Sequence, residues 1–129
     1  MRQGFVKMAA ATPDVKVADC VFNREQMVEC IRRMEEKKAK VMALPELCIT
    51  GYTCGDLFCQ DTLLTRAREE LLLLAEETKD VDALIFVGLP FEYGGKLYNV
   101  AAALCRGKIL GLVPKTSIPS YREFYEGRH

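Results

Sequence analysis

Two short, wholly apolar runs constrain the fold of this sequence more than any other feature. The runs 41–44 (Val-Met-Ala-Leu) and 83–88 (Ala-Leu-Ile-Phe-Val-Gly) have the length and composition of strands buried on both faces. The run 5–10 predicts a further strand, which ends at Thr12-Pro13-Asp14. Amphipathic stretches separate these runs, so a layered α/β arrangement is expected.

Both intervening stretches have helical periodicity. Asn23 is predicted as the N-cap of the first helix, with Gln26 completing a capping box. That helix should end near Lys38 and bury Met27, Val28, Ile31 and Met34. Asp61 or Thr62 is predicted to cap the second helix, whose inner side carries Leu63, Leu64, Ala67, Leu71, Leu74, Ala75 and Thr78.

The last third of the sequence predicts a meander of strands. A turn at 93–96 leads to strands 97–104 and 108–113, which are joined at Cys105-Arg106-Gly107. The order β-α-β-α-β-β-β predicts an α/β fold, a mixed sheet with helices on one face. Its other face needs a second layer, from a partner chain or from a continuation of the protein.

Composition excludes several classes of protein. The 129 residues suit one domain, and 18 basic residues balance 18 acidic ones, so neither nucleic acid nor a membrane surface is an expected partner. No apolar run is long enough to span a membrane and no signal pattern opens the chain, so we expect a cytoplasmic protein. Six cysteines without zinc-site spacing and a single histidine, His129, predict no metal site.

Glu46 is the first residue whose position suggests chemistry, because it follows the apolar run 41–44 and Pro45. Ligand crevices of α/β sheets open at the carboxyl ends of strands. Near Leu47 and Ile49, desolvation should raise the pKa of this carboxyl group and make it a usable general base. From position alone, a surface glutamate that starts a loop is the commoner alternative.

Lys115 occupies a comparable position, since it follows Val113-Pro114 at the end of a predicted strand. An ammonium group at a strand end can stabilise a developing oxyanion, although most lysines there only extend into solvent. If the two strands are neighbours in the sheet, Glu46 and Lys115 converge on one crevice.

Two segments resemble the nitrilase (carbon-nitrogen hydrolase) superfamily. Residues 44–52, Leu-Pro-Glu-Leu-Cys-Ile-Thr-Gly-Tyr, are similar to its Pro-Glu…Gly-Tyr signature. Residues 53–58 and the segment 113–126 are similar to the glutaminase domain of bacterial glutamine-dependent NAD synthetases and to its lysine segment. The resemblance covers residues 1–129 and implies a partial nitrilase-type glutaminase domain, the N-terminal portion of an α-β-β-α sandwich.

The resemblance also implies roles for four residues. Glu46 matches the family's general base and Lys115 its oxyanion-stabilising lysine, while Tyr52 and Tyr121 match positions of the glutamine pocket. An aromatic loop anchor and a packing residue are the alternatives for the two tyrosines. The nucleophilic cysteine of the family lies beyond its lysine segment, and we expect none of the six cysteines here to replace it.

For the parent protein, the resemblance implies hydrolysis of the side-chain amide of glutamine. The ammonia would pass to a C-terminal synthetase domain that uses ATP and magnesium to make NAD from nicotinic acid adenine dinucleotide. This chain alone is expected to be inactive, to bind no cofactor and to self-associate. A nitrilase-type amidase acting on another small amide, and a non-enzymatic interaction or structural fragment, are the alternatives.

Overall fold

The strands form a single mixed sheet in the computed structural model, which describes residues 4–51 and 61–115. Within these ranges the strand order follows the chain: β1 (Met8–Ala10), β2 (Val41–Ala43), β3 (Leu84–Tyr93), β4 (Lys96–Cys105) and β5 (Lys108–Pro114). The first three strands are parallel, and β4 and β5 add antiparallel pairs. The predicted α/β class, with a meander after two β-α-β units, is confirmed.

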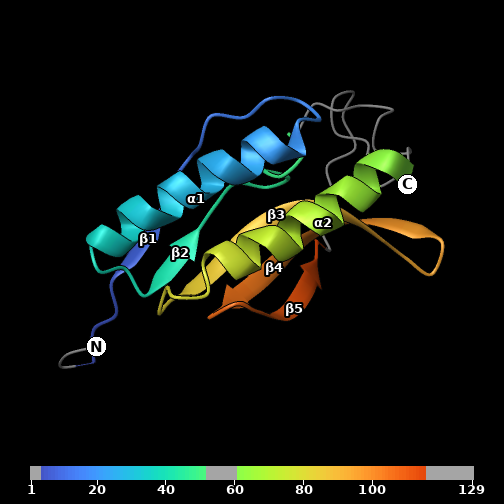
Figure 1. Cartoon of the computed structure of the whole chain (residues 1–129). Helices are drawn as coiled ribbons and strands as arrows, with labels where there is room; N and C mark the ends of the chain where they lie inside the picture. The colour runs from blue at the N-terminus through green and yellow to red at the C-terminus, as the bar shows by residue number, and fades with distance from the viewer. Residues whose placement is uncertain (1–3, 52–60, 116–129) are drawn as a thin grey trace.

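Two helices, α1 (Cys20–Glu36) and α2 (Asp61–Glu77), lie side by side on the same face of the sheet (Figure 1). Their apolar sides meet the alternate side chains of the central strands that point toward them. Met27 and Ile31 of α1, Leu74 of α2, and Ile85 and Leu89 of β3 are at most 1% exposed. The helix faces that the periodicity predicts are therefore the faces that pack.

The predicted N-cap of α1 is wrong. Asp19 caps this helix, because its Oδ1 accepts a hydrogen bond from the backbone N–H of Phe22 at 3.0 Å. Asn23 lies one turn further on, fully buried, where its amide binds the backbone of Lys16 and donates to the carbonyl of Ile49 at 2.8 Å. Its amide is thus used to hold two loops against the helix.

Other element ends also differ from the expectation. Asp61 and Thr62 lie within α2 rather than before it. The first strand is limited to Met8–Ala10 because its partner β2 has only three residues. Conversely, β3 continues past Gly88 to Tyr93, since β4 pairs with it from Ile85 onward. The turn between these strands places Gly94 and Gly95 at positive φ, as a two-residue hairpin turn requires.

The second face of the sheet carries no helix from the described residues (Figure 1). Met8 on β1 is 70% exposed, Ala43 on β2 is exposed, and Val113 on β5 is 59% exposed. The expectation that the strand 41–44 is buried on both faces is therefore wrong for this chain. Met42 packs beneath the helices, whereas its neighbours Val41 and Ala43 point to the other side.

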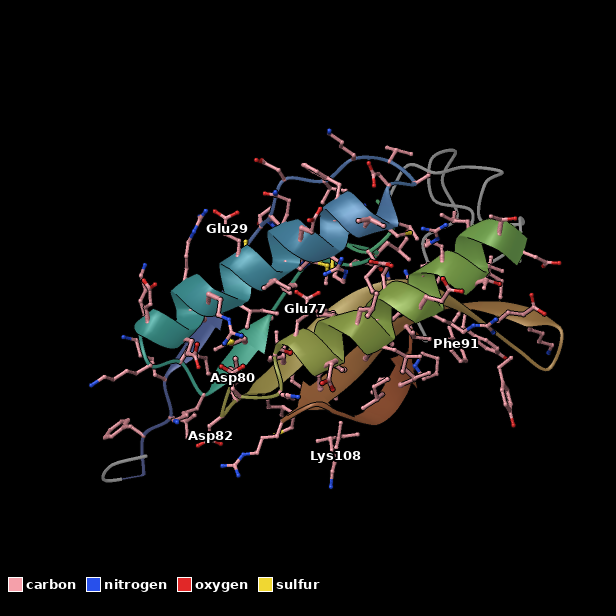
Figure 2. The ribbon with its side chains drawn as sticks, in the orientation of Figure 1. Glu29, Glu77, Asp80, Asp82, Phe91 and Lys108 are labelled. Carbon is pink, nitrogen blue, oxygen red and sulfur yellow. The ribbon has the colours of Figure 1, made fainter. Side chains whose placement is uncertain are left out.

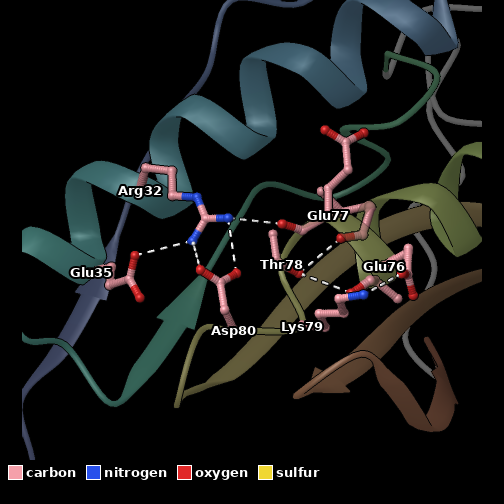
Figure 3. Close-up of polar contacts among 9 residues, drawn as sticks. Arg32, Glu35, Glu76, Glu77, Thr78, Lys79 and Asp80 are labelled. Carbon is pink, nitrogen blue, oxygen red and sulfur yellow. Dashed lines mark hydrogen bonds and ion pairs between the residues drawn. The ribbon is translucent and has the colours of Figure 1, made fainter.

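Charged side chains, among them Glu29, Glu77 and Asp80, lie on the helices and in the loop after α2 (Figure 2). Arg32 on α1 donates to both carboxylate oxygens of Asp80, at 2.9 and 3.0 Å, and to the backbone carbonyl of Glu77 at 2.8 Å (Figure 3). The guanidinium lowers the pKa of Asp80, chiefly through these hydrogen bonds. Neither helix has the length and hydropathy of a membrane span.

Candidate active site

Glu46 lies in a tight loop directly after β2. The backbone N–H groups of Cys48 and Gly51 donate to the carbonyls of Pro45 and Leu47, and Leu47 takes a positive φ of 53°. Leu47, Cys48 and Ile49 point inward and are at most 2% exposed. These inward residues anchor the loop, so the carboxylate of Glu46 is displayed at the strand end.

The loop rests on β3 at Gly88. The N–H of Ile49 donates to the carbonyl of Gly88 at 3.2 Å. A Cβ atom at position 88 would lie 2.4 Å from the backbone nitrogen of Leu47 and 2.9 Å from the carbonyl carbon of Glu46. A glycine is therefore required here, because any side chain would push the loop that carries the carboxylate off the sheet.

Lys115 reaches the same point from the end of β5. Its backbone N–H donates to the carbonyl of Asn99 on β4 at 2.8 Å, which extends the β4–β5 pairing past Pro114. Its Nζ lies 2.5 Å from Oε1 of Glu46. Although 69 residues separate the two side chains, they form an ion pair. The condition set for this convergence, neighbouring strands, is not met, because β3 and β4 lie between β2 and β5.

Asn99 is a third member of this cluster, and the sequence reasoning missed it. Its Nδ2 donates to Oε1 of Glu46 at 2.7 Å, and the residue is only 6% exposed. The available signal was an amide within the otherwise apolar strand 97–104, where asparagine is unfavourable without a specific partner.

The surroundings of the carboxylate are more polar than expected. The side chain of Glu46 is 34% exposed, and that of Lys115 is 32% exposed. Two hydrogen-bond donors contact the carboxylate oxygen Oε1. The apolar surroundings that the sequence suggested for this carboxylate are therefore not what the structure shows.

A hollow of about 340 Å³ adjoins this cluster. Four segments of three residues line the hollow: 44–46, 86–88, 99–101 and 113–115. Phe86, Ala101 and Val113 lie on the side of the sheet away from the helices, because their neighbours Ile85 and Ala102 are buried beneath them. The ion pair thus lies at the rim of a mainly apolar hollow. Ligand sites commonly combine an apolar lining with a few polar groups in this way.

Among the described cysteines, Cys48 is the closest to Glu46 in the sequence, and its burial makes it a poor nucleophile. Burial raises the pKa of the Cys48 thiol to about 12, so it stays protonated at neutral pH. Burial also raises the pKa of Cys30. Cys54 and Cys59 lie outside the described residues, as do Tyr52, Tyr121 and most of the two family-like segments. Within the described ranges, no cluster of acidic, cysteine or histidine side chains is arranged to hold a metal ion.

Comparison with known families now adds to this geometry. The sequence profile of the carbon-nitrogen hydrolase family matches residues 7–126, which include Glu46, Asn99 and Lys115. The chain belongs to the carbon-nitrogen hydrolase family. The family-like segments are therefore parts of one continuous match.

Individual relatives show which members of this family the chain is similar to. The chain is 36% identical over 127 residues to the glutamine-dependent NAD(+) synthetase of Mycobacterium tuberculosis, covering 98% of the chain and 19% of the relative. It is 32% identical to the enzyme of the same name from Aquifex aeolicus, covering 96% and 22%. The chain therefore spans about a fifth of the length of the curated relatives it matches.

Solved structures agree on the fold. A glutamine-dependent NAD(+) synthetase from Cytophaga hutchinsonii superposes with a TM-score of 0.88 at 28% identity, over 95% of this chain and 21% of that chain. An amidase from Nesterenkonia sp. gives a TM-score of 0.77 at 20% identity, over 95% and 47%. The sheet and its two helices are thus the nitrilase-type fold, and the expectation for the fold is confirmed.

Proposed function

We propose that this chain supplies the general base and the oxyanion-stabilising cation of a glutaminase site, within a longer protein that makes NAD. The observation that carries the proposal is the 2.5 Å contact between Glu46 and Lys115, formed by strand ends 69 residues apart. The 36% identity to a glutamine-dependent NAD(+) synthetase supports glutamine as the substrate.

The chemistry follows from the two charges. A cysteine thiol loses its proton to the Glu46 carboxylate, and the thiolate attacks the amide carbon of glutamine. The amide oxygen becomes an oxyanion, which the ammonium group of Lys115 stabilises. The C–N bond then breaks, Glu46 returns its proton to the departing ammonia, and a thioester remains. Glu46 next takes a proton from water, whose oxygen attacks the thioester. The C–S bond breaks, glutamate is released, and Glu46 returns the proton to the cysteine sulfur.

The nucleophile of this scheme lies outside residues 1–129. Cys48 is close to the base in sequence, but it is only 2% exposed and its thiol lies against the carbonyl of Gly88, where a substrate amide cannot reach it. We therefore expect residues 1–129 alone to release no measurable ammonia from glutamine, because members of one catalytic site act as a unit.

The remaining parts of the site and its partners also belong to the proposal. Tyr52 and Tyr121 are proposed to contact the bound glutamine. Ammonia is consumed by a separate synthetase domain, which binds ATP and magnesium and uses nicotinic acid adenine dinucleotide. The exposed sheet face, with Met8 and Val113, is consistent with further layers or self-association. A cytoplasmic location is part of the same proposal, since NAD synthesis consumes cytoplasmic ATP.

A substrate panel tests the proposal on the protein that the complete reading frame encodes. Ammonia release is measured with glutamine, asparagine, acetamide and a carbamoyl compound, and NAD formation is measured with glutamine or free ammonium as nitrogen source. Glutamine should be preferred, and it should support NAD formation. Ammonia release from a short amide only would identify a stand-alone amidase, and release from none would favour a non-enzymatic role.

A further inference from the structure

Asn99 contacts both members of the ion pair. Its side-chain Nδ2 donates to Oε1 of Glu46 at 2.7 Å, and its backbone carbonyl accepts from the N–H of Lys115 at 2.8 Å. It lies within β4, opposite Pro90 of β3, and its carbonyl binds the chain directly after β5. The donor is therefore presented from a rigid strand rather than from a loop.

The carboxylate of Glu46 needs such a restraint. The terminal torsion of a glutamate side chain has a broad, nearly two-fold energy profile, so the rotamer alone does not fix the plane of the carboxylate. Lys115 contacts the same oxygen, but in the proposed reaction its ammonium group must also serve the oxyanion. The neutral amide of Asn99 has no second role in the reaction, and its hydrogen bond to Glu46 is charge-assisted whenever the carboxylate is ionised.

We propose that Asn99 is a positioning residue, which orients the Glu46 carboxylate and favours its ionised, proton-accepting form. This inference rests on the proposed glutaminase function, in which Glu46 is the base. Because the donor is an amide N–H, it strengthens its bond when the carboxylate is charged and weakens it when the carboxylate takes a proton. Asn99 therefore sets the pH range over which the Glu46 carboxylate is ionised and can accept a proton.

The side chain of Asn99 can be tested separately from its backbone, because Lys115 binds the backbone carbonyl and Glu46 binds the side-chain amide. Substitutions at position 99 leave the carbonyl that holds the N–H of Lys115 in place, so they act on Glu46 alone. Asn99→Leu keeps the branching and the number of side-chain heavy atoms, and it removes the donor. Asn99→Asp keeps the shape and places a second carboxylate beside the first, which opposes ionisation of both.

The experiment is the pH dependence of kcat and KM for ammonia release from glutamine by the complete protein. Asn99→Leu should lower kcat about 10- to 100-fold with a smaller change in KM, because the base is misplaced while glutamine still binds. The acid limb of the kcat/KM profile should move to higher pH in both variants, by more than about one pH unit in Asn99→Asp.

A matched control separates positioning from stability. Thr78 is 1% exposed and donates to the carbonyl of Leu74 at 2.8 Å on the far side of the fold, so Thr78→Val also removes a buried hydrogen bond. It should lower the melting temperature without moving the pH profile. Wild-type kcat and pH limbs in both Asn99 variants would overturn the inference, even if their melting temperatures fall. A wild-type protein that releases no ammonia from glutamine would instead overturn the proposed function, and this inference with it.

Discussion

Gly88→Ala should dislodge the loop that carries the general base. The added Cβ would lie 2.4 Å from the nitrogen of Leu47 and 2.8 Å from the carbonyl oxygen of Pro45. Ordinary contacts need about 3.5 Å, so the loop must retreat by roughly 1 Å. All of the nearest atoms are backbone atoms, so no side-chain rotation can relieve the clash.

The size of the effect follows from this displacement. Overpacking of a tightly packed site costs about 1–3 kcal/mol, and the retreat also lengthens the hydrogen bond between the N–H of Ile49 and the carbonyl of Gly88. A shift of roughly 1 Å in a catalytic group lowers the rate about 100-fold. Stability and activity should therefore fall together, with activity the more affected.

Gly111→Ala is the matched control. Neither Gly88 nor Gly111 has a positive φ, and a Cβ at position 111 meets no described atom within 4 Å. The same methyl group there should be neutral, or stabilising by up to about 1 kcal/mol through the unfolded state. Urea unfolding measures the free energies, and ammonia release from glutamine measures activity. Equal stability and equal activity of the two variants would refute the reasoning.

Two further predictions concern residues around the core. At about pH 8, an alkylating reagent should modify the half-buried Cys105 before Cys48, because burial holds the pKa of the Cys48 thiol at about 12. Peptide mass spectrometry measures the order of modification, and modification of Cys48 first would contradict the prediction. The contribution of Cys48 to the free energy of unfolding should be constant below about pH 9, where the unfolded thiol is protonated. It should be lost as the pH rises from 9 toward 12, because the unfolded thiol then ionises and the native one does not. Arg24→Ala should destabilise the protein by about 3 kcal/mol, since Glu70, whose side chain is 5% exposed, would lose its ion pair at 2.6 Å. Adding Glu70→Gln should recover part of the loss in urea unfolding, and no recovery would contradict this account.

The features that follow from local pattern were predictable from the sequence. Apolar runs identify the strands and helical periodicity identifies the buried helix faces, because the positions that face the core recur with the period of each element and carry apolar side chains. The strand-end rule identifies Glu46 and Lys115 as candidates at one edge of the sheet. It does not show that they meet across β3 and β4, which separate their strands. Family-like segments add the roles, although Tyr52 and Tyr121 lie outside the described residues, and those two assignments stay predictions.

The features that depend on distant partners were not predictable. Asn23 looks like a helix cap, but the carbonyl that it binds belongs to Ile49, 26 residues away. Asn99 and Gly88 matter because the register of β3 and β4 places them beneath the Glu46 loop. The prediction that the strand 41–44 is buried on both faces was wrong for a related reason. The apolar composition of a strand does not show whether the described residues provide a layer on each side of it.

The most direct test of the central claim is ammonia release from amide-¹⁵N glutamine by Glu46→Gln in the complete protein, with Glu92→Gln as the control. Both variants make the same change, but Glu92 is an exposed residue near the hairpin turn that ends β3. The account predicts a loss of about 10²- to 10⁴-fold for Glu46→Gln and none for Glu92→Gln. Wild-type release of labelled ammonia by Glu46→Gln would contradict it.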